Sequence, residues 1–310
     1  MSNIKYDEYK ELVDKHLLDF LPEIDPKSET IYDAMSYSLK AGGKRLRPVL
    51  VLAACDFCGG DVKSALPYAL AIEYIHTYSL IHDDLPCVDN DDLRRGVPTN
   101  HVVFGEAMAT LAGDGLLNSA FEAMFKDMLL DFDNEKVLKC KVRAASTICK
   151  VAGCRGMIAG QVADIEAENT VCSKEMLDYI HTNKTGAMIV GAIQAGAHIG
   201  NVNEKDLRAL TEYAENLGLA FQICDDILDV VGTTEELGKN VGHDEETNKS
   251  TYPALYGLEK SEERFKELNQ KAIEALKDYG EEADFFRFLV KKLENRRNGI
   301  TSNPNKRVLS

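Results

Sequence analysis

The sequence predicts an all-α fold, built as a single large helical bundle. Three observations support this. Apolar residues recur at i, i+3, i+4 and i+7 over most of the 310 residues. No segment shows alternating β-branched residues bounded by turn signals, so strands are not expected. Only eight prolines interrupt the chain. Several of the predicted helices are rich in Ala and Gly, whose small side chains let helices pack closely, as a bundle requires.

The predicted helices follow one another along the whole chain. The first covers residues 28–41, with Ser28 as a candidate N-cap and Gly42-Gly43 as its stop signal. Long helices with apolar residues at this spacing are predicted next, over residues 65–84, 106–131, 136–168, 174–199 and 204–232. Two shorter helices with a more charged face follow, over residues 261–278 and 281–297.

Residues at the helix ends support these boundaries. Ser173 and Asn203 stand where N-caps belong. No linker or low-complexity segment separates the helices, so we expect a single domain over residues 1–310. The helical periodicity is lost in residues 299–310, which are expected to form a frayed tail.

Composition and charge narrow the functional class. The chain is 45% hydrophobic and 28% charged, as in ordinary globular proteins, and its net charge is −15. This acidic balance opposes non-specific binding to nucleic acid or to an anionic membrane surface. The first residues lack the apolar core of a signal peptide, and the longest weakly polar run, residues 186–200, is too short to span a bilayer. We therefore expect a cytoplasmic protein without nucleic-acid or membrane partners.

The eight cysteines are then expected to be reduced thiols. Cys55 and Cys58 form a lone CxxC pair, and no second pair follows at zinc-site spacing. They are interpreted as small buried side chains, with metal binding or redox chemistry as the weaker alternative.

Two acidic segments each end an apolar helical stretch. The first, "DDLPCVD", begins at Asp83, and Pro86 disfavours helical geometry at Leu85. The helix should therefore end near Asp84, and the chain should turn back to bring Asp89 towards Asp83. In the second, "DDILD", helical spacing puts four polar residues on one stripe of an otherwise apolar helix. These residues are Gln222, Asp225, Asp226 and Asp229.

Such carboxylate clusters suit a hard divalent cation. Mg²⁺ accepts one or two protein carboxylates and completes its shell with water and substrate phosphate oxygens. A calcium EF-hand is excluded because neither segment has the required twelve-residue loop. An acidic loop in solvent is the alternative for either cluster alone, but two clusters with matched spacing favour metal binding.

Basic residues flank both acidic segments. They are Lys44, Arg45 and Arg47, then Arg94 and Arg95, then Lys184 beside Thr185, and finally Lys239 and Lys249. Any one of them could form a surface salt bridge, but the whole set predicts a ligand with many phosphate oxygens. The chain has no G-x-x-x-x-G-K-[ST] segment and no G-x-G-x-x-G segment after a strand, so a simple diphosphate is favoured over a nucleotide.

Six segments, in order, resemble the motifs of the trans-isoprenyl diphosphate synthases, the short-chain prenyltransferases that include farnesyl and geranylgeranyl diphosphate synthases. They are "GGKRLRP", "HTYSLIHDDLPCVDNDDLRRG", "GQVAD", "NKTG", "FQICDDILD" and "GKNVGHDEETNKSTYP", and the resemblance spans roughly residues 28–300. It implies an all-α bundle around a deep central cavity, known as the isoprenoid synthase fold. It also implies a homodimer that joins isopentenyl diphosphate head-to-tail to an allylic diphosphate.

The resemblance also implies roles for individual residues. Asp83 and Asp89, supported by Asp84, would bind two Mg²⁺ ions, and Asp225 would bind a third with help from Asp226 and Asp229. The allylic diphosphate would be held by Arg94, Lys184, Lys239 and Lys249. The isopentenyl diphosphate would be held by Lys44, Arg47, His76 and Arg95, although His76 could instead be a helix-packing histidine. Oxygens of Thr185, Gln222 and the Lys184 carbonyl would stabilise the allylic cation, so Lys184, Thr185 and Gln222 are the predicted catalytic residues.

Product length is predicted from Tyr78 and Ser79. In the family, the position five residues before the first aspartate often forms the floor of the cavity for the growing chain, and here it is Tyr78. Pro86 and Cys87 form the two-residue insertion typical of the bacterial and plant type. With Tyr at the floor, the resemblance implies farnesyl diphosphate, made from dimethylallyl and geranyl diphosphates. Geranylgeranyl diphosphate is the alternative product, since Tyr78 could simply pack in the core above a deeper floor.

Two other classes are disfavoured. A class I terpene cyclase would typically carry an Asn/Ser/Glu second metal motif and would not need "GGKRLRP" for a second diphosphate. A non-catalytic subunit of a prenyl synthase would typically have lost aspartates or basic residues, and this chain retains all of them.

Overall fold

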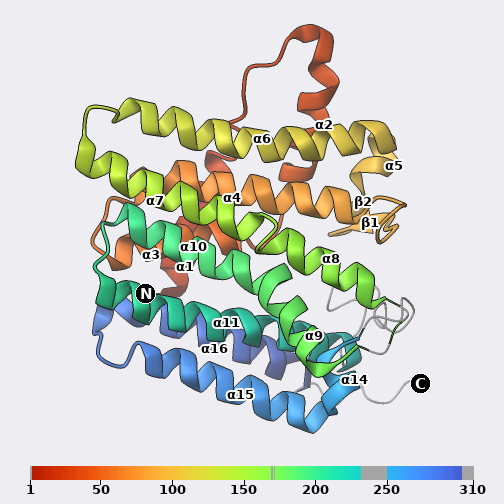
Figure 1. Ribbon diagram of the computed structural model, residues 1–310, viewed down its shortest axis with the longest axis vertical. Helices are drawn as coiled ribbons and strands as arrows, with labels where there is room; N and C mark the ends of the chain where they lie inside the picture. Colours follow the sequence, from red (N-terminus) through yellow and green to blue (C-terminus); the bar gives the residue numbers. More distant parts are fainter. Residues whose placement is uncertain (1, 169, 171, 232–249, 302–310) are drawn as a thin grey trace. The chain divides into compact units, whose positions relative to one another are not determined.

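The computed structural model describes residues 2–168, 170, 172–231 and 250–301, with side chains as far as Arg297 at the C-terminal end. The described chain is almost entirely helical (Figure 1), which confirms the all-α prediction. Its residues form two compact units. The N-terminal unit comprises Ile4–Cys149 and Ala192–Val202. The C-terminal unit comprises Lys150–Gly191 and the described residues from Asn203 onwards, with Ser2 and Asn3. The expectation of one domain stays a prediction.

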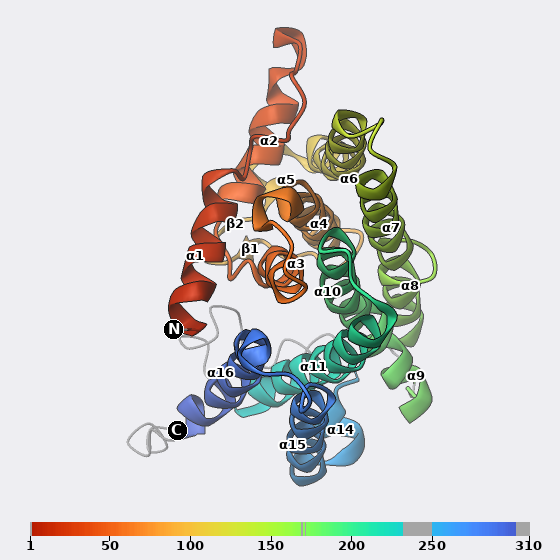
Figure 2. The same ribbon diagram turned by 90° about the vertical axis from the view of Figure 1, so that its left-hand side faces the viewer.

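The N-terminal unit is built around helix α4. Its elements are α1 (Ser2–Lys15), η1 (Pro26–Ser28), α2 (Glu29–Lys40), α3 (Leu46–Phe57), α4 (Val62–Asp83), β1 (Leu93–Arg94), β2 (Val97–Pro98), α5 (Asn100–Phe104), α6 (Glu106–Leu130) and α7 (Glu135–Ala152). Figure 2 shows α4 between α3 and α6, its two main packing partners. Most residues of α4 are buried, which explains why its apolar residues occur on nearly all faces.

The N-terminal unit differs from the predictions in three ways. Ser28 stands at the N-cap of α2 as predicted, but its side chain makes no capping bond, whereas Asp25 caps η1 by accepting from Lys27 N at 2.8 Å. The prediction of no strands was wrong at β1 and β2, an antiparallel pair whose two-residue strands are too short to show alternation. Helices α1, α3 and α5 were not predicted. Pro48 lies in the first turn of α3, where proline is tolerated.

The C-terminal unit is organised along α11. Its elements are α8 (Met157–Ala167), α9 (Lys174–Ile180), the π-helical segment η2 (His181–Gly186), α10 (Ala187–Ile199, which continues into the N-terminal unit), α11 (Glu204–Val231), α14 (Tyr252–Tyr256), α15 (Leu258–Ala275), η3 (Glu281–Ala283) and α16 (Asp284–Thr301). Helices α15 and α16 run alongside α11 (Figure 1). The buried Tyr213 hydroxyl donates to Phe286 O at 2.8 Å, and the two rings meet edge-on, so α11 and α16 are joined by both polar and apolar contacts.

The helix boundaries in this unit were partly predicted. Ser173 and Asn203 are confirmed as caps, because their side chains accept from Met176 N at 3.1 Å and Asp206 N at 2.9 Å. The prediction of one helix over 136–168 was wrong, because a turn separates α7 from α8. Gly156 explains the break, since a Cβ there would lie 2.1 Å from Val151 O. The tail predicted from residue 299 was wrong at its start, because α16 continues to Thr301, and residues 302–310 lie outside the described part.

Within the described ranges, no helix combines the length and apolar character needed to cross a bilayer.

Candidate active site

The first acidic segment forms a tight turn at the end of α4. The helix ends at Asp83, and Asp84 is its C-cap. The chain then reverses, so that Asp89 N donates to Asp83 O at 2.8 Å and Asp91 N donates to Asp84 O at 3.2 Å. Asn90 takes the left-handed conformation at φ 53°, which asparagine tolerates better than most residues. Both the predicted helix end and the predicted return of Asp89 towards Asp83 are confirmed.

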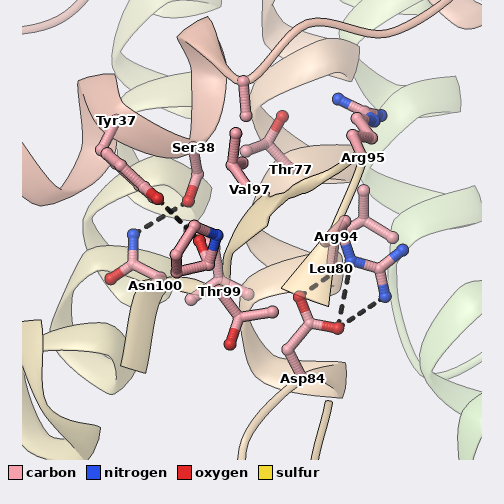
Figure 3. Close-up of a pocket in the computed structure, with 13 residues that line it drawn as sticks. Tyr37, Ser38, Thr77, Leu80, Asp84, Arg94, Arg95, Val97, Thr99 and Asn100 are labelled. Atoms are coloured by element: carbon pink, nitrogen blue, oxygen red, sulfur yellow. Dashed lines mark hydrogen bonds and ion pairs between the residues drawn. The ribbon is translucent and has the colours of Figure 1, made fainter. Parts of the chain in front are cut away.

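Asp84 is held by a two-pronged ion pair with Arg94. The Asp84 residue is only 3% exposed. Its carboxylate accepts from Arg94 Nε at 2.8 Å and from Arg94 Nη2 at 2.6 Å (Figure 3). The short β1–β2 ribbon carries Arg94 to this position. Burial raises the pKa of Asp84, and the carboxylates of Asp91 and Asp89 raise it further, while Arg94 opposes the shift. The repulsion among the carboxylates of this acidic segment is therefore partly offset by Arg94.

A basic cluster forms around His76, one to two turns before Asp83 on α4. Arg47 Nη1 lies 3.4 Å from His76 Nε2. Burial lowers the pKa of His76 well below its usual value, and the charges of Arg47, Arg95, Arg94 and Arg45 lower it further. The imidazole is therefore neutral at physiological pH. Arg47 thus lies beside a neutral side chain that also feels the charge of three further arginines, which is the electrostatic arrangement expected of an anion site.

Arg95 connects the two basic segments of this unit. Its guanidinium donates to Gly42 O and lies against Gly43, where a Cβ would come within 2.8 Å of Arg95 Cζ. Gly43 also has φ +133°, so both its backbone conformation and the close approach of Arg95 require a residue without a side chain. Lys44 follows directly in the chain. The structure thus brings Lys44, Arg47, His76 and Arg95 to one region, as predicted. A small cavity of about 30 Å³ adjoins it, lined by Asp84, Arg94 and Arg95 among others (Figure 3).

The C-terminal unit holds a second polar cluster, centred on η2. Lys184 Nζ contacts Asp164 Oδ2 at 2.6 Å. Thr185 Oγ1 donates to Gln222 Oε1 at 2.9 Å, and Gln222 Nε2 donates to Asp226 Oδ1 at 3.0 Å. The predicted catalytic residues of this unit therefore meet. π-Helical turns are often found at functional sites, and this one carries Lys184 and Thr185.

The second acidic segment also lies on one stripe of α11, as predicted. Asp226 Oδ2 accepts from Tyr252 N at 2.8 Å and lies 3.3 Å from Nε2 of the buried His181. Asp225 Oδ1 contacts Arg296 Nη1 at 2.5 Å, and Asp229 is buried. A cavity of about 140 Å³ adjoins this stripe, lined by Asp164, His181, Lys184, Gln222 and Asp226 among others.

Four residues of these clusters had no predicted role: Asp164, His181, Tyr252 and Arg296. Asp164 ends the quoted "GQVAD" segment, so a signal for it existed. The other three come into contact with the acidic stripe only through the packing of η2, α14 and α16 against α11. Lys239 and Lys249, predicted to bind the allylic diphosphate, lie outside the described residues.

The carboxylates fit Mg²⁺ by their chemistry. Among the described residues, no three His, Cys, Asp or Glu side chains are gathered as a ready-made metal cage. Mg²⁺ does not need one, because it keeps several waters and takes one or two carboxylates together with substrate phosphates. Asp83 and Asp89 at a helix end, and Asp225 on α11, are oxygen donors of the required type.

Tyr78 and Ser79 lie one turn before the acidic turn. Tyr78 is 7% exposed, and its ring meets His82 edge-on with the centroids 5.5 Å apart. The Ser79 hydroxyl donates to His76 O at 2.7 Å, so it stays close to its own helix. Tyr78 is thus a bulky, packed side chain on the helix that ends in Asp83.

Comparison with known proteins identifies the family. The polyprenyl synthetase family model matches residues 28–287. The chain is similar to the farnesyl diphosphate synthase of Geobacillus stearothermophilus, with 49% identity over 258 residues, 83% of this chain and 85% of the relative. It is also similar to the geranylgeranyl diphosphate synthase of Cyanophora paradoxa, with 43% identity over 270 residues, 87% and 88% of the two chains.

Among solved structures, the apo FPP/GFPP synthase of Zymomonas mobilis superposes with a TM-score of 0.82 at 34% identity, covering 94% of this chain and 99% of the other. The similarity in sequence and the similarity in fold agree. The chain therefore belongs to the polyprenyl synthetase family, the trans-isoprenyl diphosphate synthases, and is a prenyltransferase.

Proposed function

We propose that this prenyltransferase condenses isopentenyl diphosphate head-to-tail with dimethylallyl and then geranyl diphosphate, giving farnesyl diphosphate in a Mg²⁺-dependent reaction. One observation carries the proposal. Within the N-terminal unit, Arg47 and neutral His76 form a basic cluster next to a separate turn of carboxylates at Asp83, Asp84 and Asp89. The first group suits a diphosphate bound directly, and the second suits a diphosphate bound through metal ions.

The carboxylates would hold the metal. Asp83 and Asp89, with Asp84 in support, would bind two Mg²⁺ ions, and Asp225 would bind a third, with Asp226 and Asp229 ordering its waters. Mg²⁺ would supply Lewis-acid stabilisation of the leaving diphosphate. Arg94 and Arg296 would hold the carboxylates of Asp84 and Asp225 in position for the metal ions.

The basic residues would bind the two diphosphates separately. Lys44, Arg47, His76 and Arg95 would hold isopentenyl diphosphate, where a neutral His76 can donate one N–H to a phosphate oxygen. Arg94 and Lys184, with Lys239 and Lys249, would hold the allylic diphosphate. Arg94 uses Nε and Nη2 for Asp84. Its Nη1 takes no part in those bonds, so Arg94 can grip a phosphate while staying paired.

The C-terminal cluster would stabilise the allylic cation left when diphosphate departs. Asp226 accepts from the Gln222 amide nitrogen, which turns the Gln222 carbonyl oxygen towards Thr185. The Thr185 proton is used in that bond, so its oxygen lone pairs can face a positive carbon. The oxygens of Thr185, Gln222 and the Lys184 carbonyl are weak nucleophiles, so they would lower the energy of the cation without forming a bond to it. The departed diphosphate would take the final proton, and no protein general base is required.

Tyr78 supports the fifteen-carbon product. A bulky ring on α4, five residues before Asp83, would block a tail growing past it. Geranylgeranyl diphosphate is the alternative product, because the chain is also similar to a geranylgeranyl diphosphate synthase. Homodimeric assembly, which the family resemblance implies, and a cytoplasmic location, expected from the sequence, belong to the same proposal.

Product analysis tests the proposal. Purified protein would be incubated with dimethylallyl and isopentenyl diphosphates and Mg²⁺, with EDTA in a parallel sample, and the hydrolysed alcohols identified by mass spectrometry. We expect mainly farnesol, abolished by EDTA. Geranylgeraniol would refute the product assignment, and no elongation by folded protein would refute the function, leaving the cyclase or regulatory-subunit alternatives.

A matched pair of variants sharpens the metal assignment. Asp83→Asn should lower kcat by roughly a thousandfold, since it removes a proposed metal ligand. Asp92→Asn is the control, because Asp92 is exposed in the same acidic turn and has no proposed ligand role. Equal activity of the two variants would contradict the role of Asp83.

A further inference from the structure

Arg45 lies in the first basic segment, yet its side chain does not face a substrate. The residue is 5% exposed, and each of its three guanidinium nitrogens donates to a different element. Nε donates to Asp14 Oδ1 at 2.8 Å in α1, Nη1 to Glu73 Oε1 at 2.8 Å in α4, and Nη2 to Leu39 O at 2.7 Å in α2. Because all three nitrogens are used inside the protein, Arg45 is not itself a diphosphate ligand.

The backbone around Arg45 is fixed as well. Arg45 has φ 53° and ψ 31°, a left-handed conformation that is unfavourable for a residue with a side chain, and it is the N-cap of α3. Its neighbour Lys44 accepts at its carbonyl from the Tyr6 hydroxyl at 2.6 Å. Strained conformations persist only where the surroundings enforce them. The contacts of Arg45 and Tyr6 therefore determine how the chain enters α3, and so where Lys44 and Arg47 point.

The position of Glu73 connects this arrangement to the substrate site. Glu73 and His76 are three residues apart on α4 and share one face of the helix. Arg45 and Arg47 are two residues apart at the start of α3. The Arg45–Glu73 ion pair thus joins α3 to α4 about one helical turn from the contact between Arg47 and His76 at 3.4 Å.

Charge adds a second reason for the pair. Glu73 is 2% exposed, and the carboxylates of Glu73 and Asp14 outweigh burial to raise the pKa of Arg45. The two carboxylates neutralise the charge of Arg45, which would otherwise repel the nearby Arg47 and disfavour a proton on His76. A buried guanidinium with its partner removed would repel the very cations that bind substrate.

We propose that Arg45 and Glu73 are positioning residues for the isopentenyl diphosphate subsite, holding Lys44 and Arg47 against His76. This inference rests on the proposed function, since it concerns one of the two substrates of that reaction. The inference predicts an effect on one substrate only, because Lys44, Arg47 and His76 are assigned to isopentenyl diphosphate and not to the allylic diphosphate.

Steady-state kinetics of Arg45→Lys and Glu73→Gln test the inference. Both changes nearly keep side-chain size, but the first loses the planar fork and the second loses the charge. We expect KM for isopentenyl diphosphate to rise at least ~10-fold in each variant. KM for the allylic diphosphate and kcat at saturation should change by less than about threefold. The double variant should be no worse than the poorer single variant, because the two residues act as a unit.

Lys141 provides the matched control. It is another buried cation of the same unit, with its side chain 6% exposed, and it contacts Asp127 at 2.7 Å and Asp131 at 2.5 Å between α6 and α7. Lys141→Met should lower the melting temperature without changing the ratio of the two KM values. If Arg45→Lys and Glu73→Gln behave like Lys141→Met, or raise both KM values equally, the positioning role is wrong.

Two further measurements keep the outcome unambiguous. Calorimetric binding of isopentenyl diphosphate should weaken at least ~10-fold in Arg45→Lys and stay unchanged in Lys141→Met. Should Arg45→Lys fail to fold, Tyr6→Phe removes the hydroxyl that donates to the Lys44 carbonyl and should raise the same KM more modestly. A folded wild-type protein that binds isopentenyl diphosphate but forms no product would overturn the proposed reaction and leave the positioning claim standing.

Discussion

Several charged residues of the candidate site form ion pairs with other side chains of the protein. Arg94 grips Asp84, Lys184 contacts Asp164, and Arg296 contacts Asp225. Charge-assisted bonds of this kind are among the stronger hydrogen bonds in proteins. They limit the repulsion within each acidic segment and restrict side-chain motion, so less ordering is needed when a diphosphate binds.

Tyr78 is the residue on which the predicted product length depends. Tyr78→Ala should shift the product beyond fifteen carbons, because the ring that would block the tail is removed. Tyr78→Phe keeps the ring and should leave the product unchanged. Product alcohols identified by mass spectrometry provide the measurement.

The substitution to Ala also empties a packed position, and its cost in the free energy of unfolding is about 3 kcal/mol. Folding of the variant must therefore be checked by circular dichroism. An unchanged product from folded Tyr78→Ala would show that the floor lies deeper than Tyr78.

His76 predicts a pH dependence of stability. Its pKa in the folded protein is lowered, by burial first and then by Arg47 and the other arginines. In the unfolded chain the pKa is near 6.5, so below that pH the unfolded chain takes up a proton that the native protein does not. The stability contribution of neutral His76 is therefore present above about pH 6.5 and is lost as the pH falls towards the folded-state pKa.

Wild type should then lose more stability than His76→Gln between about pH 7.5 and about pH 5.5. Urea unfolding at the two pH values measures the difference. His198, whose pKa is lowered by burial and by Arg143, is present in both proteins and cancels from the comparison. Equal losses in the two proteins would mean that His76 titrates normally.

At the scale of elements, the site depends on how closely α8 packs against η2. A Cβ on Gly160 would lie 2.2 Å from Lys184 N, so the two backbones are in contact there. Gly160 is the first residue of the "GQVAD" segment, and Asp164 of the same helix holds Lys184. The helix that contacts the π-helical segment therefore also orients its lysine.

Gly160→Ala should force these elements apart. We expect a loss of about 1–3 kcal/mol in the free energy of unfolding, together with a lower kcat. Gly115→Ala is the matched control in another helix, because the nearest atom there is the Met35 sulfur, which belongs to a flexible side chain. Thermal unfolding and steady-state kinetics of both variants would show whether the backbone contact matters. Similar behaviour of the two variants would argue against it.

At the scale of the whole molecule, the apolar surface of α6 bears on assembly. Leu111, Phe125, Leu129 and Leu130 are 54%, 64%, 68% and 79% exposed. Large exposed apolar patches often mark interaction surfaces. The expected homodimer would bury this surface against a second copy of the chain.

Phe125→Glu combined with Leu129→Glu should convert a dimer to a monomer, since each would place a carboxylate in an apolar contact. Light scattering coupled to size-exclusion chromatography measures the mass. Lys126→Glu changes charge at an exposed position between them and is the control. A wild-type monomer, or a double variant that stays dimeric, would refute a dimer formed through α6.

Much of the fold and part of the site could be read from local sequence. The helices over 65–84 and 204–232, the turn after Asp84 and the polar stripe from Gln222 to Asp229 all depend on residues close together in the chain. Periodicity, proline sterics and capping chemistry act over that range. The errors came from local signals too weak to recognise, such as the break at Gly156 and the two-residue strands β1 and β2.

Which residues the charged side chains pair with could not be predicted from the sequence, because the pairing depends on the tertiary structure. Arg45 meets Glu73 across 28 residues of sequence, and Arg296 meets Asp225 across 71. No local pattern encodes such contacts, because they arise only when α3 packs on α4 and α16 packs on α11. The sequence could therefore reveal which residues have the chemistry to bind diphosphate and metal. Helix packing alone determined which of them are oriented by a buried partner, since a side-chain contact exists only once distant segments are brought within a few ångströms.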